Sequence, residues 1–399
     1  MGIAAQEAPD RAGFGTSLAL RGRVGVTRIV LTNFRNYREA RLDLDTGPVV
    51  LTGPNGAGKT NLLEAVSMLA PGRGLRAARL GDIDRRDRSE TGAPAGWAVA
   101  ASLSTRRGPV QIGTGRDATA GERRIVHIDG ETARGQAALG ERLGLVWLTP
   151  AMDRIFGEGP SGRRRLLDRL VLSLDPQHAG RVAAYEHALR ERARLLRDGP
   201  ADPTWLGALE EVMAEKGIAV AAARREAVQR LDLACAEMRG PFPAARLALI
   251  GAVEEWLDEM PALAAEERFK RALADGRRED AAAGGAGVGP HRCDLAVTYA
   301  AKDIPAAAAS TGEQKALLIS ILLAHAGLQK AVRGEAPVLL LDEVAAHLDP
   351  ARRGALFDVL AALDSQVWLS GTELSSFAGL RSRARFLSVN DGAVADSTL

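Results

Sequence analysis

The hydrophobic residues of this 399-residue chain follow two periods, and the change between them divides the chain. Short alternating or fully apolar runs, typical of strands, come first, at residues 27–31, 40–44 and 48–52. Three more alternating pieces between residues 97 and 130 predict an antiparallel meander, and residues 144–148 predict another buried strand. A helical stripe occurs once in this part, at residues 61–69. The pattern therefore predicts a β-rich N-terminal part.

From residue 161 to about 240 the apolar residues fall at helical spacing instead. One stripe runs from Val182 to Leu196 and a second from Leu206 to Leu231. The glycine and prolines within residues 198–203 force a reversal between them. Two antiparallel helices follow from this pattern. They form either a projecting arm about 30–50 Å long or an ordinary helical subdomain, and the pattern leaves both open.

The C-terminal part returns to mixed structure, with a helix expected at residues 315–328 and an apolar strand at 337–341. Residues 281–289, mostly alanine and glycine, are typical of a linker. We therefore expect an α/β protein of four segments. They are a disordered extension (1–22), an N-terminal lobe (23–160), a helical domain or arm (161–285) and a C-terminal lobe (286–399).

Composition excludes several classes of protein. The net charge is only +2 and aromatic residues make up 4%, so no overall positive field indicates a polyanion partner. Cys235 and Cys293 stand alone, without the spacing of a metal site, and fit a reducing compartment. The longest apolar stretch, residues 316–328, is too short to span a bilayer. We expect a cytoplasmic protein.

A glycine-rich loop directly follows the apolar strand at residues 48–52. It fits the phosphate-loop pattern G-x-x-x-x-G-K-[ST] and lies between a strand and a helix, as that motif requires. Its backbone N–H groups would point at phosphate, Lys59 would bridge the β- and γ-phosphate oxygens, and the Thr60 hydroxyl would bind Mg²⁺. The residues expected to bind ATP here are Gly53, Pro54, Asn55, Gly56, Ala57, Gly58, Lys59 and Thr60.

Two acids end the apolar strand at residues 337–341. Asp342 can hold Mg²⁺ through water, and Glu343 can position or deprotonate the attacking water. Residues 310–314, Ser-Thr-Gly-Glu-Gln, precede a helix and form either an anion site or a simple helix N-cap. Because 250 residues separate Thr60 from Ser310, the chain must fold back on itself to complete one site.

These motifs resemble those of ABC-type ATPases. Residues 310–314 are similar to their LSGGQ-type loop, with Ala309 and Thr311 as departures, and residues 346–349 resemble their D-loop. From Ile29 onward almost the whole chain resembles the RecF family of bacterial recombination mediators. The most specific segments are residues 31–37, 53–64, 163–168, 289–294, 310–320 and 338–349. The fold implied is an ABC-type ATPase head, a mixed sheet with flanking helices plus the meander, carrying the helical domain or short arm.

The resemblance implies a slowly hydrolysing ATPase that forms a homodimer with ATP. It assigns Arg35 and Asn61 to ATP binding in the same chain. Thr372 replaces the histidine usual after the next strand, and we assign it to γ-phosphate sensing; no convincing Q-loop glutamine lies near residues 147–149. The residues assigned to the ATP of the second protomer are Ser310, Gly312, Glu313 and Asp349.

The resemblance also implies partners. They are double-stranded DNA, its junctions with single strands, and the proteins RecR and RecO, which together help to load RecA; no membrane is involved. Arg73, Arg76 and Arg79 are the first candidates for DNA contact, and residues 163–165 and 190–197 form a second basic region. A solvated, salt-bridged surface is the ordinary alternative for such runs. Because aromatic residues are scarce, duplex backbone contacts are favoured over base stacking along a single strand.

Other functions compete with this hypothesis. A transporter ATPase subunit has a much shorter spacing between the same motifs, and a full SMC or Rad50 protein has a far longer coiled coil than about 80 residues. An SMC/Rad50-like clamp with another DNA role, an ABC-type ATPase with a non-DNA partner, and a clamp that uses ATP only to dimerise stay open. An intact Glu343 favours hydrolysis over the last of these.

Overall fold

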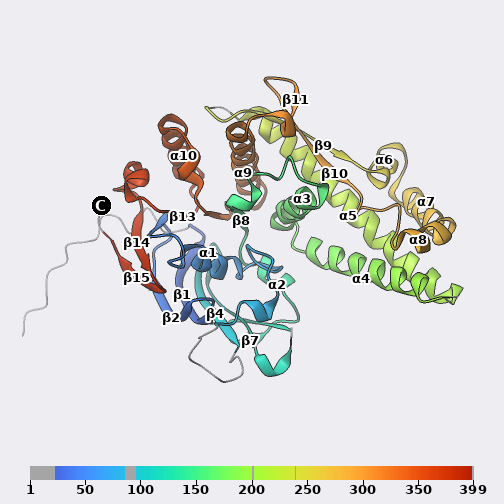
Figure 1. Ribbon diagram of the computed structural model, residues 1–399, viewed down its shortest axis with the longest axis horizontal. Helices are drawn as coiled ribbons and strands as arrows, with labels where there is room; N and C mark the ends of the chain where they lie inside the picture. The colour runs from blue at the N-terminus through green and yellow to red at the C-terminus, as the bar shows by residue number, and fades with distance from the viewer. Residues whose placement is uncertain (1–22, 86–95, 122, 200–201, 239, 398–399) are drawn as a thin grey trace, which may run out of the picture.

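Two six-stranded sheets and a long pair of helices make up most of the molecule (Figure 1). The computed structural model describes residues 23–85, 96–121, 123–199, 202–238 and 240–397. The extension expected at residues 1–22 lies outside these ranges. The sheets occupy one side of Figure 1, and the helix pair α4 and α5 reaches away from them toward the other.

The first sheet is antiparallel, with the strand order β2-β1-β4-β5-β6-β7. It contains the expected meander, and its buried face carries alternate residues of each long strand, such as Val99, Ala101 and Leu103. Its strands are β1 (Gly25–Phe34), β2 (Tyr37–Asp43), β4 (Trp97–Thr105), β5 (Gly108–Arg116), β6 (Arg124–Ile128) and β7 (Glu131–Thr132).

The second sheet joins the two ends of the chain, in the order β15-β14-β3-β13-β12-β8. Every pair is parallel except β14 with β15. Strand β3, which precedes the glycine loop, lies between two C-terminal strands, so the chain folds back as expected. The strands are β3 (Val49–Thr52), β8 (Leu145–Leu148), β12 (Val338–Leu341), β13 (Val367–Gly371), β14 (Arg385–Asn390) and β15 (Ala393–Asp396).

Each face of the second sheet contributes to a different core. Val49 and Leu51 face the first sheet and α1 (Lys59–Ser67), whereas Val50 faces a helical layer. This two-sided burial explains why β3, β8 and β12 are buried throughout, and apolar except for Thr52, rather than alternating. The helical layer contains α3 (Pro160–Leu174), α9 (Thr311–Arg333) and α10 (Pro350–Leu363), and the short α2 (Ala137–Gly140) lies near the first sheet.

Helix α9 extends the expected 315–328 helix at both ends. Among the described residues it is the one helix long and apolar enough to cross a membrane, but 72% of its apolar window is buried inside the protein. It packs against α5, α3 and α10. Its apolar character therefore reflects its place in the core of the fold.

The helical pattern after residue 161 is confirmed by α3 and by the paired helices α4 (His178–Arg197) and α5 (Pro203–Glu237). Helix α5 has 35 residues and is therefore about 50 Å long. We call the distal part of this pair, with α6 (Ala252–Glu259), α7 (Ala262–Asp275) and α8 (Arg277–Ala283), the arm (Figure 1). Tyr185, Met213 and Phe269 belong to a separate core inside it.

One expectation for this region was wrong, and a second was right only in part. The segment 161–285 is not entirely helical, because β9 (Ala245–Ile250) pairs with β10 (Asp294–Tyr299), which in turn pairs with β11 (Ile304–Pro305). The linker expected at 281–289 begins as the end of α8, whereas residues 284–289 have no helix or strand, as expected. Alanines there continue a helix whose Asp280 is buried against Arg192, and this contact across the arm overrides the loop-like composition.

Candidate functional site

The glycine loop between β3 and α1 adopts a conformation that only glycine tolerates at two positions. Gly53 and Gly58 have φ angles of 147° and 118°. A Cβ at Gly53 would run into the backbone oxygen of Val389 on β14, and a Cβ at Gly58 would lie 2.6 Å from the Asn36 amide. At Gly56, also left-handed, nothing lies within 4 Å of the Cβ position. The loop is therefore closed toward the protein and open on its outer side.

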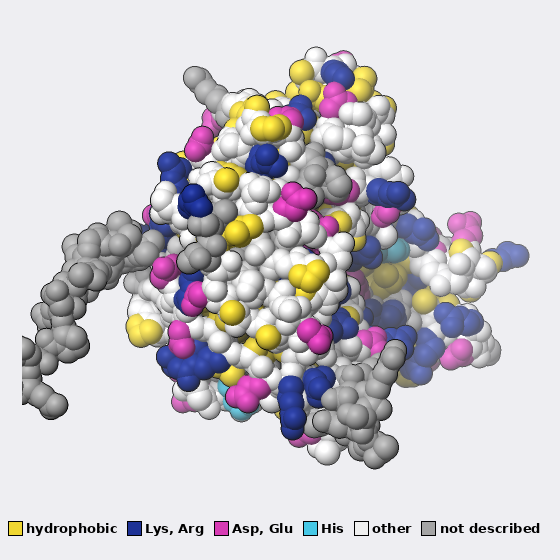
Figure 2. Space-filling view, turned by 60° about the vertical axis from the view of Figure 1, so that its left-hand side comes forward, with side chains coloured by type: hydrophobic (Ala, Val, Ile, Leu, Met, Phe, Trp, Pro, Cys, Tyr) yellow, Lys and Arg dark blue, Asp and Glu magenta, His cyan; other side chains and the backbone are white. Residues whose placement is uncertain are grey.

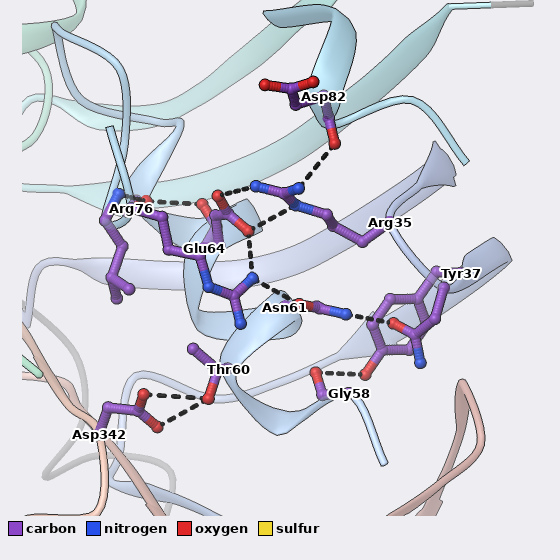
Figure 3. A network of polar contacts seen from close by, with 12 residues as sticks. Arg35, Tyr37, Gly58, Thr60, Asn61, Glu64, Arg76, Asp82 and Asp342 are labelled. Carbon is purple, nitrogen blue, oxygen red and sulfur yellow. Dashed lines mark hydrogen bonds and ion pairs between the residues drawn. The ribbon is translucent and has the colours of Figure 1, made fainter. Parts of the chain in front are cut away.

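Side chains from the turn between β1 and β2 hold the loop from behind. The Asn36 amide donates to the carbonyl of Ala57 (3.1 Å), and the Tyr37 hydroxyl donates to the carbonyl of Gly58 (3.0 Å). The Asn61 amide, on α1, donates to the Asn36 side chain (2.7 Å) (Figure 3). Asn36 and Tyr37 therefore support the glycine loop, a role that the sequence pattern did not indicate.

The start of α1 is prepared for an anion. Its N-cap is Gly58, and no side chain caps the first-turn N–H groups, which leaves them and the positive end of the helix dipole free for phosphate. The Lys59 ammonium donates to the carbonyls of Gly53 (2.8 Å) and Pro54 (2.9 Å). Burial lowers the pKa of Lys59, and the nearby carboxylates of Glu343 and Asp342 oppose that shift. The loop and lysine fit a triphosphate.

Thr60 and Asp342 meet although 282 positions separate them in the chain. The Thr60 hydroxyl lies 3.0 and 3.2 Å from the two Asp342 carboxylate oxygens (Figure 3). Mg²⁺ in nucleotide sites takes one or two protein oxygens and completes its shell with phosphate and water. The pair of hard oxygens fits that ion, and among the described residues no cluster of three His, Cys, Asp or Glu offers another metal site.

Ser370 on β13 was missed by the sequence analysis. Its hydroxyl donates to Asp342 (2.5 Å) and accepts from the backbone N–H of Glu343 (3.0 Å). The parallel register of β12 with β13, with Leu341 beside Leu369, places Ser370 next to Asp342. Its only sequence signal was a polar residue at the end of a buried strand. Ser370 therefore fixes both acids at the sheet edge.

Glu343 turns the chain away from β12 in a left-handed conformation, with φ 52° and ψ 28°. For a residue with a side chain, this conformation costs about 1–2 kcal/mol. Glu343 is half-buried and close enough to Lys59 to affect its pKa. The left-handed backbone and the Ser370 contact hold this acid near the phosphate loop.

Glu64, which the sequence analysis also missed, joins two arginines that it had assigned to different ligands. Arg35 binds both Glu64 carboxylate oxygens at 2.7 and 2.8 Å, and Arg76 binds one of them at 2.7 Å (Figure 3). Arg76 also donates to Asn61 (2.6 Å). The Glu64 side chain is completely buried. In this chain both arginines therefore point at the phosphate-loop helix.

The loop at residues 310–314 forms a capping box at the start of α9. Ser310 accepts from the backbone N–H of Glu313, and the Glu313 carboxylate accepts from that of Ser310. Lys302, together with Ser310, lowers the pKa of Glu313 to about 2. The N-cap alternative is thus present in the structure. Ser310, Thr311 and Gly312 are nevertheless exposed.

Several residues expected at the ATP site are not assembled in one chain. In the described ranges, no hydrogen bond joins residues 310–314 to the phosphate loop. Asp349 is exposed and caps α10 by accepting from the Arg352 N–H (2.9 Å). Thr372, just after β13, is also exposed. The single chain therefore brings Asp342 to the phosphate loop, with Glu343 beside it, and presents the loop at 310–314 as a separate surface.

The two basic regions differ in character. Arg73, Arg76 and Arg79 are exposed in the loop after α1. In the second region Arg163 binds Asp294 through two hydrogen bonds, and Arg192 is 1% exposed inside the arm, so both have structural roles. Figure 2 shows Lys and Arg side chains gathered around a hollow where the rounded body meets the arm.

Comparisons with known proteins agree with this geometry. The family model described as the RecF/RecN/SMC N terminal domain matches residues 25–384. The chain is 50% identical over 372 residues to the DNA replication and repair protein RecF of Mesorhizobium japonicum, covering 92% of this chain and 97% of the relative. It is 48% identical over 375 residues to the protein of the same name from Rhizobium meliloti, covering 93% and 99%.

Solved structures share the fold at lower identity. A structure of "the recombination mediator protein RecF-ATPrS in RecFOR pathway" superimposes with a TM-score of 0.82, at 22% identity, covering 94% of this chain and 98% of that one. An Smc head domain from Pyrococcus furiosus, bound to the C-terminal domain of ScpA, gives a TM-score of 0.53 at 17% identity, covering 94% and 96%. The architecture expected from the motifs, an ABC-type ATPase head, is confirmed.

Proposed function

The chain belongs to the RecF family of DNA replication and repair proteins, and from this premise we propose that it is an ATP-driven clamp on duplex DNA. The protein is an ATPase of the RecF and SMC type. The proposal adds that hydrolysis is slow and that two chains close around ATP. The closed dimer binds duplex DNA at single-strand gaps in the cytoplasm.

The meeting of Thr60 with Asp342 carries this proposal. Bound Mg²⁺, held by these two residues, would neutralise phosphate charge. The N–H groups of the loop and Lys59 bind and orient the phosphates, and Asn61 and Arg35 flank them. Glu343 accepts the proton of the attacking water, and Thr372 contacts the γ-phosphate side.

Dimerisation follows from the half-site in each chain. Ser310, Gly312 and Asp349 are exposed and lie apart from the phosphate loop of their own chain. We propose that they, with Glu313, bind the ATP held by a second chain in a head-to-tail pair. The capping box occupies the Ser310 hydroxyl, which donates to the Glu313 carboxylate (2.9 Å). In the proposed pair this hydroxyl would turn to the phosphate, and the exposed Gly312 would offer its N–H at the positive end of α9.

DNA is the proposed cargo because the relatives are DNA replication and repair proteins and because exposed arginines follow α1. Arg73 and Arg79 would contact the phosphate backbone, and Arg76 would join them once released from Glu64. Backbone contacts carry no sequence preference. In the cell the clamp would act with RecR and RecO, marking junctions where RecA is loaded.

Fluorescence anisotropy with a labelled duplex, in a salt series with ATP or ADP, tests this function. We expect ATP-dependent binding, and Arg73→Gln or Arg79→Gln should each reduce the slope of log K against log salt by about one. Arg107→Gln is a matched control, since Arg107 is exposed in the turn between β4 and β5. Binding that ignores both nucleotide and salt would contradict the clamp.

A further inference from the structure

A cavity of about 560 Å³ lies between the body of the molecule and the arm. Its walls come from the loop after α1, the end of β8, and helices α3 and α4. The cavity thus joins the candidate DNA-contact loop to the arm. The ATP site proposed above does not use it.

The cavity has apolar walls. Pro71 and Leu75 line it from the loop after α1, Met152 from the segment after β8, and Val182 and Ala183 from α4. Ala183 is exposed. Such walls accept a flat or aliphatic group of a few ångström thickness and exclude water from it.

Its charged lining has four arginines against the three acids Glu158, Asp168 and Glu186, and three of those arginines are unpaired among the described residues. Glu186 pairs with Arg190 (3.6 Å) outside the cavity lining. Arg73 from the loop, and Arg165 and Arg169 one turn apart on α3, line the cavity. Within the ranges that the structure describes, none of these three side chains has a carboxylate partner. Asp168, the acid beside them on α3, is occupied by two hydrogen bonds from Arg224 and one shared with His178. The cavity therefore favours an anion.

Arg169 gives the cavity a flat polar wall. Its guanidinium stacks on the Trp147 ring, with 4.2 Å between Cζ and the ring centroid. Nη2 contacts the Met152 sulfur (3.6 Å), whereas the buried Nε has no hydrogen-bond partner in the described parts of the chain. Burial lowers the pKa of this guanidinium to about 9. A buried donor without an acceptor is unfavourable, so the ligand of this wall should carry acceptors on a flat group.

We propose that this cavity binds one unpaired nucleotide of a DNA strand, with its base against the Arg169–Trp147 stack and its phosphate near Arg73 and Arg165. The inference rests on the proposed function and explains its preference for gaps. A base fills the apolar walls and offers edge acceptors to Arg169. The apolar anchor of an acidic peptide would fill the same walls but leave the Arg169 donors unpaired.

Two DNA probes of equal length test the proposal by anisotropy with ATP. One is a duplex with a single-nucleotide gap and an unpaired 2-aminopurine; the other is a continuous duplex closed by hairpins. Stacking of one base predicts at least about fivefold tighter binding of the gapped probe. Filling the cavity with Ala183→Trp should bring the ratio of gapped-probe to continuous-duplex affinity to about one. The affinity for the continuous duplex should stay within about twofold of the wild-type value. Arg169→Lys should reduce the same ratio and abolish the change in 2-aminopurine fluorescence on binding.

His187→Trp is the matched control, because His187 is exposed on α4 and does not line the cavity. It should keep the wild-type ratio. If the wild type prefers the gap and Ala183→Trp preserves that preference, the nucleotide cavity is wrong while the clamp stands, and an acidic peptide becomes the better occupant. If the wild type binds neither probe, the proposed function fails and the cavity proposal with it. The nucleotide cavity would also be wrong if the protein bound free deoxyadenosine monophosphate but had equal affinity for the gapped probe and the continuous duplex.

Discussion

At the scale of single residues, Lys59 shows how the site is built before ATP arrives. Its ammonium is held by the carbonyls of Gly53 and Pro54 in its own loop. Burial and two nearby acids affect its pKa in opposite directions. The phosphate oxygens of a triphosphate would accept these hydrogen bonds and pair with the positive charge of the ammonium. The phosphate loop therefore positions Lys59 before ATP binds.

Lys59→Ala should weaken ATP more than ADP, because the γ-phosphate loses its charge partner whereas the loop N–H groups still bind the diphosphate. We expect at least a tenfold larger loss for ATP, corresponding to about 1.4 kcal/mol. Isothermal titration calorimetry of both nucleotides measures this difference. Equal affinity of mutant and wild type for ATP would show that Lys59 does not pair with the γ-phosphate.

Ser370→Ala should weaken ATP binding only when Mg²⁺ is present. The hydroxyl that fixes Asp342 is lost, as is the acceptor for the Glu343 N–H, and a lost hydrogen bond to a charged group costs about 1.5–3 kcal/mol. Ser375→Ala, an exposed serine in the same region, is the control. Calorimetric titrations with Mg²⁺ and with EDTA compare the two. An Mg²⁺-independent loss in Ser370→Ala would contradict this role.

The residues predicted from the sequence were those with a local signature. Lys59, Thr60, Asp342 and Glu343 belong to short motifs, and the structure brings Thr60 to Asp342 as predicted. Glu64 was not anticipated, because its partners Arg35 and Arg76 lie in other segments and an acid on a helix usually faces solvent. Ser370 was hidden for the same reason, since its role depends on the register of neighbouring parallel strands.

At the scale of elements, the arm depends on one buried ionic network. Arg192 on α4 is 1% exposed and binds Glu210 on α5, Asp280 on α8 and the carbonyl of Leu273 on α7. Arg277 binds the same Glu210. Four helices therefore share one guanidinium.

Arg192→Met should destabilise the arm by about 3–5 kcal/mol, because it leaves buried carboxylate and carbonyl acceptors without their donor. ATP binding should persist, since the arm has its own core. Arg190→Met, on the exposed side of α4, is the matched control and should change stability by less than about 1 kcal/mol. Differential scanning calorimetry measures both. A single unchanged transition in Arg192→Met would show that the network does not stabilise the arm.

Element type was predictable where one pattern ran long enough. The 35 residues of α5 and the strands β3, β8 and β12 of the second sheet follow directly from periodicity. Strand β9 did not, because its six residues pair with β10, across 43 residues that include α6, α7 and α8. Helix α8 was concealed by alanines and glycines that serve loops and helices alike, and only Asp280 packing against Arg192 decides between them.

At the scale of the whole molecule, no hydrogen bond in the described ranges joins the loop at 310–314 to the phosphate loop of the same chain. The phosphate loop, Asp342 and Glu343 converge on one edge of the second sheet, whereas Ser310 and Gly312 stand exposed at the start of α9. Our central claim is that ATP joins these two regions between two chains. Neither the sequence nor one chain's fold could supply the partner surface, because in this proposal that surface forms only in the pair.

Sedimentation velocity of the Glu343→Gln variant tests this claim most directly. The amide cannot accept the proton of the attacking water, so ATP should stay bound. We predict a monomer without nucleotide or with ADP, and a dimer with ATP and Mg²⁺. Adding Ser310→Arg should return the protein to a monomer that still binds ATP. The control Ala264→Arg, at an exposed position of α7 in the arm, should leave the dimer intact. A monomer in ATP, or a dimer that survives Ser310→Arg, would contradict the account.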